Sequence, residues 1–206
     1  MDFLGFVIIC VKVLVVFSAT MLTVLMMVYA ERRVSAFMQG RLGPNRVGPQ
    51  GLLQPIADGI KFLMKEDIIP AEVNKPIYLL APAMLLIPAL MTFAVIPFGS
   101  TITLFGREVP LQVADLNVGI LYILALTSIG VYGLVLAGWA SNSKYSLIGG
   151  LRSSAQLISY ELAMGLSVVS VILLAGSLKL NVIVEDQQGY LLSWNVFKQP
   201  VAFLIF

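Results

Sequence analysis

Residues 3–30 read FLGFVIICVKVLVVFSATMLTVLMMVYA, an apolar run that only Lys12 interrupts. As a helix this run is about 40 Å long, whereas the hydrocarbon core of a bilayer is about 30 Å thick. The run is too long for a signal-peptide core and no basic segment precedes it, so we expect a retained transmembrane helix. Lys12 is expected to extend its amine to an interface or a polar gap.

The composition extends this interpretation to the whole chain. Of 206 residues, 59% are hydrophobic and only 12% are charged, and the mean hydropathy is +0.94. A soluble protein of this size could not keep so much apolar surface away from water. The net charge of +2 provides no basic field for nucleic acid. We therefore expect a membrane protein with no nucleic-acid partner.

The residues that usually hold redox centres are nearly absent from the sequence. It contains one cysteine, Cys10, and no histidine. Haem, Fe–S clusters and structural zinc are held mainly by histidine and cysteine, so none of these groups fits this chain. If the protein takes part in redox chemistry, we expect the redox centres to lie on other subunits.

Four further apolar runs predict more membrane helices. We expect complete spans at 77–98, 118–140 and 153–175, and the start of another at 196–206. The last run is too short to cross a bilayer. We therefore expect one membrane domain, residues 1–206, that is the N-terminal part of a longer protein. The predicted fold class is an all-α polytopic membrane protein.

Basic residues predict the orientation of these spans. Nine lie on one side of the membrane, in segment 31–75 and at Lys144 and Arg152, whereas Arg107 and Lys179 lie on the other. This bias places segment 31–75 in the cytoplasm, or in the matrix or stroma of an organelle, and the N-terminus outside.

Two short elements are expected outside the bilayer core. Segment 55–66 predicts an amphipathic helix on the cytoplasmic side, lying along the membrane or against a partner. Its apolar residues recur at three- and four-residue spacing, while another face carries Asp58, Lys61 and Lys65. On the opposite side, 101–104 and 108–113 predict a small β-hairpin.

A charged segment rich in glycine and proline follows the first span. Glu31-Arg32-Arg33 is followed by QGRLGPNRVGP at 39–49. From the residues alone we favour a positive-inside clamp and a series of turns. The alternative is that glycine and proline fix an irregular backbone that holds Arg41 and Arg46 where a polar ligand headgroup would dock.

Glu161 lies in the fourth predicted span, about nine residues or roughly 13 Å from its start. A carboxylate near mid-bilayer costs about 2.5–3.5 kcal/mol even on lenient insertion scales. A structural hydrogen bond to a neighbouring helix would explain a carboxylate at this depth. We favour a place on a proton path, which intramembrane acids commonly mark. Asp115, at the outer start of the third span, is more simply a helix-start charge and a secondary candidate for that path.

Three stretches carry a family resemblance. They are ERR at 31–33 with GRLGPNRVGPQGLLQPIADGIK at 40–61; ADLNVG at 114–119; and GWASNSKYSL at 138–147 continuing through GLR at 150–152 to QLISYE at 156–161. They resemble the H-subunit family of bacterial NADH-quinone oxidoreductase, respiratory complex I, whose mitochondrial counterpart is NADH dehydrogenase subunit 1. The resemblance covers the whole chain in order.

The resemblance implies a role at the joint between the peripheral and membrane arms of a complex. Quinone would be the substrate, and NADH, FMN and Fe–S clusters would lie on partner subunits, with no metal or flavin on this chain. Glu161 would belong to a charged path through the membrane. The residues implied in the quinone chamber or in arm contact are Glu31, Arg32, Arg33, Arg41, Arg46, Asp58 and Lys61.

Members of the family continue through further helices and an acidic cytoplasmic loop, and no segment of this sequence corresponds to them.

Two alternatives to this family stay open. The chain could be the equivalent subunit of a membrane-bound hydrogenase or of a deazaflavin- or ferredoxin-dependent dehydrogenase. A secondary transporter is the other alternative, although no inverted repeat supports it. The expected location is the bacterial cytoplasmic membrane, with an organellar inner membrane as the alternative.

Overall fold

The computed structural model describes residues 3–104 and 106–206, and most of them are helical. The chain divides into two compact units, Met1–Ile68 and Ile69–Phe206. Within the described residues, four helices are long and apolar enough to cross a membrane. The predicted class of an all-α polytopic membrane protein is therefore confirmed.

The first unit is built on α1 (Phe3–Met38), which continues well past the predicted end of its apolar run. The last turns contain neither glycine nor proline, so nothing interrupts the helical hydrogen bonds. The segment Glu31–Arg33 consequently lies inside the helix rather than after it. The helix ends where Gly40 adopts a φ of +65° and the N–H of Arg41 donates to the Ala36 carbonyl at 3.0 Å.

The segment that follows α1 is an irregular loop held by backbone hydrogen bonds between its own residues. It includes a short 3₁₀ turn, η1 (Pro49–Gly51), and a hydrogen bond of 3.2 Å from the N–H of Leu53 to the carbonyl of Val47. Gly51 has a φ of +80°, and a Cβ there would lie 2.2 Å from the carbonyl oxygen of Pro44. Only glycine fits this position.

The predicted amphipathic helix is present as α2 (Gln54–Leu63), which is shorter than expected at its C-terminal end. Pro55 occupies its first turn, where a missing N–H costs nothing. The apolar side chains Ile56, Ile60 and Leu63 remain exposed. This face is therefore available to lipid or to another protein.

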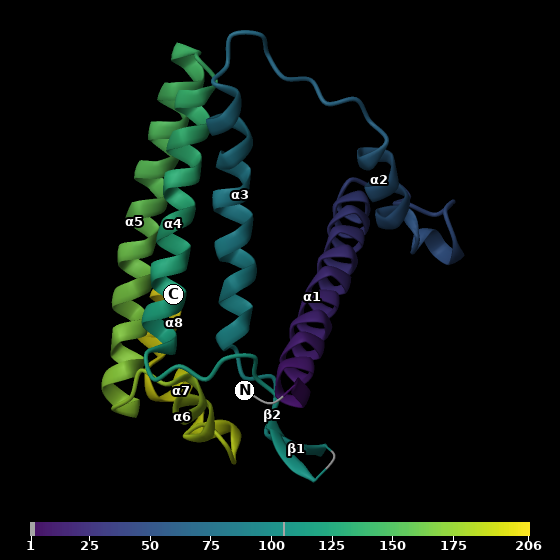
Figure 1. Ribbon diagram of the computed structural model, residues 1–206. Coiled ribbons are helices and arrows are strands. Elements are labelled where there is room, and N and C mark those ends of the chain that lie inside the picture. Colours follow the sequence, from purple (N-terminus) through teal and green to yellow (C-terminus); the bar gives the residue numbers. More distant parts are fainter. Residues whose placement is uncertain (1–2, 105) are drawn as a thin grey trace. The chain divides into compact units, whose positions relative to one another are not determined.

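The second unit contains three long helices that lie side by side (Figure 1). They are α3 (Lys75–Thr92), α4 (Gly119–Ala140) and α5 (Lys144–Ala175). The helix α3 contains Pro82 and Pro88 and continues as a 3₁₀ turn, η2 (Phe93–Val95). Prolines are tolerated in such helices because neighbouring helices satisfy the freed backbone groups.

Glycines bring the backbones of these helices close together. A Cβ on Gly133 of α4 would lie 2.9 Å from the carbonyl oxygen of Ala81 in α3, and a Cβ on Gly138 would lie 2.8 Å from that of Ser146 in α5. Membrane helices commonly pack through small residues in this way, because apolar burial gives no advantage over lipid.

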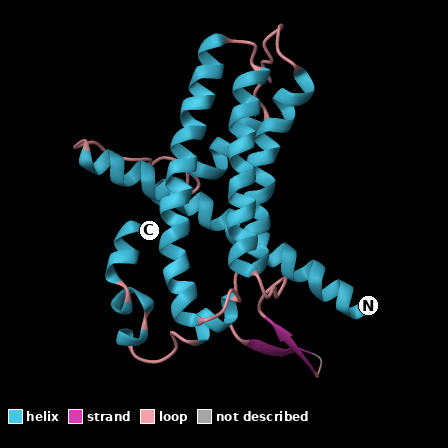
Figure 2. Cartoon of the chain, turned by 90° about the vertical axis from the view of Figure 1, so that its left-hand side faces the viewer, coloured by secondary structure: helices cyan, strands magenta, loops and turns pink. Residues whose placement is uncertain are grey.

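Short elements complete the second unit. The predicted hairpin is present as β1 (Thr101–Leu104) and β2 (Arg107–Pro110), antiparallel with Thr101 opposite Pro110 (Figure 2). Its second strand ends earlier than predicted. After α5 come α6 (Leu180–Glu185), a 3₁₀ turn η3 (Leu191–Ser193), α7 (Asn195–Lys198) and α8 (Pro200–Ile205).

Two boundaries of the later helices differ from the prediction. The helix α5 begins at Lys144 rather than residue 153, so Glu161 lies near its middle. The run 196–206 is not one helix, because it breaks at Gln199. A proline disfavours helical backbone at the residue before it, and Pro200 has this effect on Gln199, whose φ and ψ are −139° and 68°.

Candidate functional site

Asp58 connects α2 to α1. The guanidinium of Arg32 forms an ion pair with one carboxylate oxygen, and the Gln54 amide donates to the other at 3.2 Å. The side chain of Asp58 is 20% exposed, whereas that of Arg32 is 47% exposed. Both oxygens of Asp58 therefore have partners, and two of the predicted site residues are brought together to hold α2 against α1.

Tyr29 is a site residue that the sequence analysis missed. Its hydroxyl donates to the backbone carbonyl of Gln50 at 2.9 Å and accepts from the guanidinium of Arg33. The guanidinium carbon also lies 5.7 Å from the centre of the Tyr29 ring, within range of a cation–π interaction. The four-residue spacing on one helix predicts the Tyr29–Arg33 contact. The contact with Gln50 attaches the loop to α1.

The other predicted residues of the first unit are exposed. The Nε of Arg41 donates to the side-chain oxygen of Gln39 at 2.7 Å. A guanidinium has five N–H donors, of which this contact uses one. The remaining exposed members of the predicted set are Glu31, Arg46 and Lys61. The set therefore divides into residues that hold the loop and α2 in place and residues that present charge at the surface.

Glu161 lies at the contact between α4 and α5. The hydroxyl of Ser128 in α4 donates to one carboxylate oxygen of Glu161 in α5 at 3.1 Å. The side chain of Glu161 is half-buried. Among the described residues, Ser128 supplies the hydrogen bond that ties this carboxylate to a second helix. The arrangement places a titratable group between two packed membrane helices.

Asp115 is not at the start of a helix, which corrects the helix-start interpretation. The helix α4 begins at Gly119, four residues after Asp115. The carboxylate of Asp115 forms an ion pair of 2.7 Å with the amine of Lys179. The amide of Asn181 donates to Gln112 at 2.9 Å and lies 3.4 Å from Asp115. These contacts fasten the segment before α4 to the start of α6.

Gln112 is the buried centre of this polar group. It is 5% exposed, and its amide nitrogen donates to the backbone carbonyl of Val95 at 2.6 Å. The sequence analysis missed Gln112 and Asn181, because their partners lie far away in the chain. The group connects three segments of the chain and gives Asp115 a structural role through its polar contacts.

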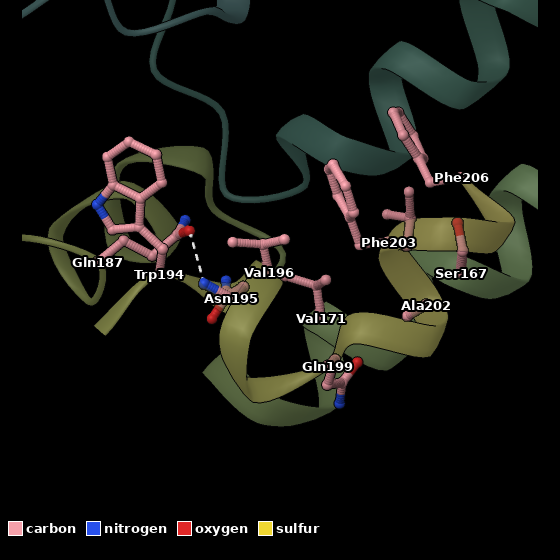
Figure 3. Close-up of a pocket in the computed structure, with 11 residues that line it drawn as sticks. Ser167, Val171, Gln187, Trp194, Asn195, Val196, Gln199, Ala202, Phe203 and Phe206 are labelled. Carbon is pink, nitrogen blue, oxygen red and sulfur yellow. Dashed lines mark hydrogen bonds between the residues drawn. The ribbon is translucent and has the colours of Figure 1, made fainter. Parts of the chain in front are cut away.

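A cavity of about 340 Å³ lies between α5 and the broken α7–α8 segment (Figure 3). Its walls are mainly apolar, with Val171 and Phe203 among them, and Gln187 accepts a hydrogen bond of 3.1 Å from the N–H of Asn195 at its edge. None of the predicted site residues lines this cavity. Among the described residues, no three Cys, Asp or Glu side chains are grouped to hold a metal ion.

Comparisons with known proteins find relatives along nearly the whole chain. A family model described as NADH dehydrogenase matches residues 11–206. A curated relative, the first of the NADH-quinone oxidoreductase H subunits of Geobacter metallireducens, is 60% identical over 95% of this chain and 58% of its own length. The corresponding H subunit of Salinibacter ruber is 55% identical over 93% of this chain and 53% of its own length.

A third relative, the first such H subunit of Cytophaga hutchinsonii, is 50% identical over 93% of this chain and 55% of its own length. The chain therefore spans somewhat more than half the length of the curated relatives that it matches. Because the family model matches nearly the whole chain, the chain belongs to the NADH dehydrogenase family.

Proposed function

We propose that this chain belongs to the membrane-embedded H subunit of a proton-pumping NADH-quinone oxidoreductase. In that complex it helps to form the quinone-binding chamber and links quinone reduction to proton translocation. The observation that carries the proposal is the loop between α1 and α2. Its backbone is fixed by Gly51 and by the Tyr29 contact, and it presents Arg41 and Arg46 to the surface.

The chemistry of the loop and α2 suits an amphiphilic ligand. A quinone has a polar headgroup with two carbonyl acceptors and a long apolar tail. Exposed guanidinium groups donate to such acceptors, while Ile56, Ile60 and Leu63 of α2 offer an apolar surface for a tail or for lipid. Partner subunits of the peripheral arm supply the NADH site, the FMN and the Fe–S clusters.

The basic residues after α1 support an orientation with the loop in the cytoplasm and the N-terminus outside. We place the chain in the bacterial cytoplasmic membrane, where other subunits of the membrane arm cover the exposed helix faces. Glu161, half-buried between α4 and α5, is the principal member of the proton path. Asp115, whose charge Lys179 already balances, is a secondary member.

Purification from the native membrane tests the proposal at the level of the complex. We expect the chain to co-isolate with subunits that carry FMN and Fe–S clusters. Recovery with a nickel-containing subunit would instead assign it to a membrane-bound hydrogenase. Recovery as an isolated monomer would favour a secondary transporter. Either of these two results would overturn the proposal.

The exposed guanidinium of Arg41 provides a test of the quinone chamber. Arg41→Ala is expected to lower quinone reduction by roughly tenfold, because charge-assisted hydrogen bonds to the headgroup are lost. Electron transfer from NADH to a soluble artificial acceptor should stay near the parent rate, because that reaction uses the flavin on a partner subunit. The measurement is the ratio of the two rates in purified complex.

The matched control is Lys65→Ala, which removes an exposed cation from the same unit outside the loop. It should leave both rates close to those of the parent complex. If Arg41→Ala lowered the two rates equally, Arg41 would serve assembly rather than quinone binding.

A further inference from the structure

Ser128 has one hydroxyl hydrogen and two acceptors within its reach. Its Oγ lies 3.0 Å from the backbone carbonyl oxygen of Leu124 and 3.1 Å from Oε2 of Glu161. A serine hydroxyl donates one hydrogen bond and accepts up to two. The hydrogen can therefore point to only one of these oxygens at a time, and the two distances are nearly equal.

The two residues of this contact lie on helices that pack against each other. Ser128 and Leu124 belong to α4, and Glu161 belongs to α5. Farther along this helix pair the two backbones approach closely, since a Cβ on Gly150 would lie 3.1 Å from the carbonyl oxygen of Leu134. The Leu124 carbonyl belongs to the backbone of α4 and the Glu161 carboxylate reaches Ser128 from α5, so rotation of the hydroxyl hydrogen is enough to change partner.

We propose that Ser128 positions Glu161 as a two-state proton switch, an inference that rests on the proposed place of Glu161 in the proton path. When Glu161 is ionised, the Ser128 hydroxyl donates to its carboxylate. When Glu161 takes up a proton, its new O–H donates to Ser128 Oγ, and the Ser128 hydrogen turns to the Leu124 carbonyl. One proton is added to Glu161, and no covalent bond of Ser128 is broken.

This arrangement gives the Ser128 hydroxyl and Oε2 of Glu161 a hydrogen-bond partner in both states of Glu161. An unpaired polar group in an apolar environment is costly, so a carboxyl group that loses its partner in one state strongly favours the other. With Ser128 present, the carboxylate has a donor and the carboxylic acid has an acceptor. Glu161 can then gain and release a proton without loss of this hydrogen bond in either its ionised or its protonated form.

The first arm of the test uses activity. Ser128→Ala in the assembled complex should lower coupled quinone reduction and proton pumping roughly three- to tenfold, the size expected for one lost interhelical hydrogen bond. Ser128→Thr should restore both, because threonine keeps a hydroxyl that also bonds to the carbonyl four residues earlier in a helix. Ser159→Ala is the matched control.

Ser159 is a suitable control because it has the same chemistry without the carboxylate. Within the described residues its hydroxyl donates to the Ala155 carbonyl at 3.0 Å and takes no part in the Glu161 contact. Its removal deletes a serine hydroxyl from the helix that carries Glu161. Parent activity is expected, and a loss equal to that of Ser128→Ala would overturn the proposal.

The second arm uses a spectroscopic signature that a merely structural serine would not change. Infrared difference spectra of the complex at two pH values contain the C=O stretch of protonated Glu161, identified by its loss in Glu161→Gln. In Ser128→Ala this band should move to higher wavenumber, because the carboxylic acid loses its acceptor. In Ser128→Thr and Ser159→Ala it should stay at the parent position.

The two arms separate this inference from the proposed function. Full proton pumping by Glu161→Gln would overturn the role of Glu161 itself. Lost pumping in Glu161→Gln, with parent activity or an unmoved band in Ser128→Ala, would overturn only the switch. Reduced activity and a shifted band in Ser128→Ala, both restored by threonine, support it.

Discussion

Replacement of Glu161 by glutamine is expected to remove most of the proton pumping and coupled quinone reduction of the assembled complex. Glutamine keeps the shape of the side chain and can still accept a hydrogen bond from Ser128, but it cannot bind or release a proton in the physiological range. A loss on the order of tenfold or more is expected if a proton must pass through this group. The measurement is proton translocation in vesicles that contain intact complex.

Two further variants make this result specific. Glu161→Asp should be milder than Glu161→Gln, because it keeps an acid but withdraws it from Ser128 by one methylene. Glu185→Gln, which neutralises an exposed carboxylate of α6, should retain parent pumping. Undiminished pumping by Glu161→Gln would mean that Glu161 serves as a structural hydrogen-bond acceptor between two helices.

Replacement of Gly51 by alanine is expected to have the largest effect in the loop between α1 and α2. Its φ of +80° costs a residue with a side chain about 1–3 kcal/mol, and the new Cβ would lie 2.2 Å from the carbonyl oxygen of Pro44. The loop must therefore open. We expect quinone reduction per complex to fall at least about tenfold, or the peripheral arm to be lost during purification.

Gly59→Ala is the control for this prediction, because it makes the same chemical change in α2. A Cβ on Gly59 meets no atom within 4 Å, and alanine favours a helix by about 1 kcal/mol over glycine. This variant should keep its activity and its peripheral arm. Native gel electrophoresis and quinone reductase assays check both variants. Parent behaviour of Gly51→Ala would show that the loop conformation is dispensable.

Apolar runs predicted where the membrane helices lie but not where they end. Hydrophobicity reports the depth of the bilayer, whereas a helix ends where its backbone hydrogen bonds are interrupted. The helix α1 therefore continues through Glu31–Arg33 to Met38, shortly before Gly40, and α5 starts at Lys144. The break at Gln199 could have been predicted from Pro200, because a proline restricts the backbone of the residue directly before it.

The contacts between different elements at the candidate sites could not be predicted from the sequence. Arg32 and Asp58 meet because the loop returns α2 to α1, and their separation of 26 residues gives no signal for it. Ser128 meets Glu161 through the register of α4 against α5, across 33 residues. Tyr29 bonds a backbone carbonyl, which every residue possesses, so no pattern of side chains could have marked its partner.

The glycine contacts of α4 also have a mechanical consequence. With Gly133 against Ala81 and Gly138 against Ser146, α4 is in close backbone contact with both α3 and α5. A one-residue screw motion of α4, about 1.5 Å along its axis with about 100° of rotation, would bring the Cβ of Trp139 or Ala137 to the place of Gly138 against the backbone of α5. These close contacts therefore oppose such a motion of α4, and we expect the three long helices to move as one unit when force is applied to any of them.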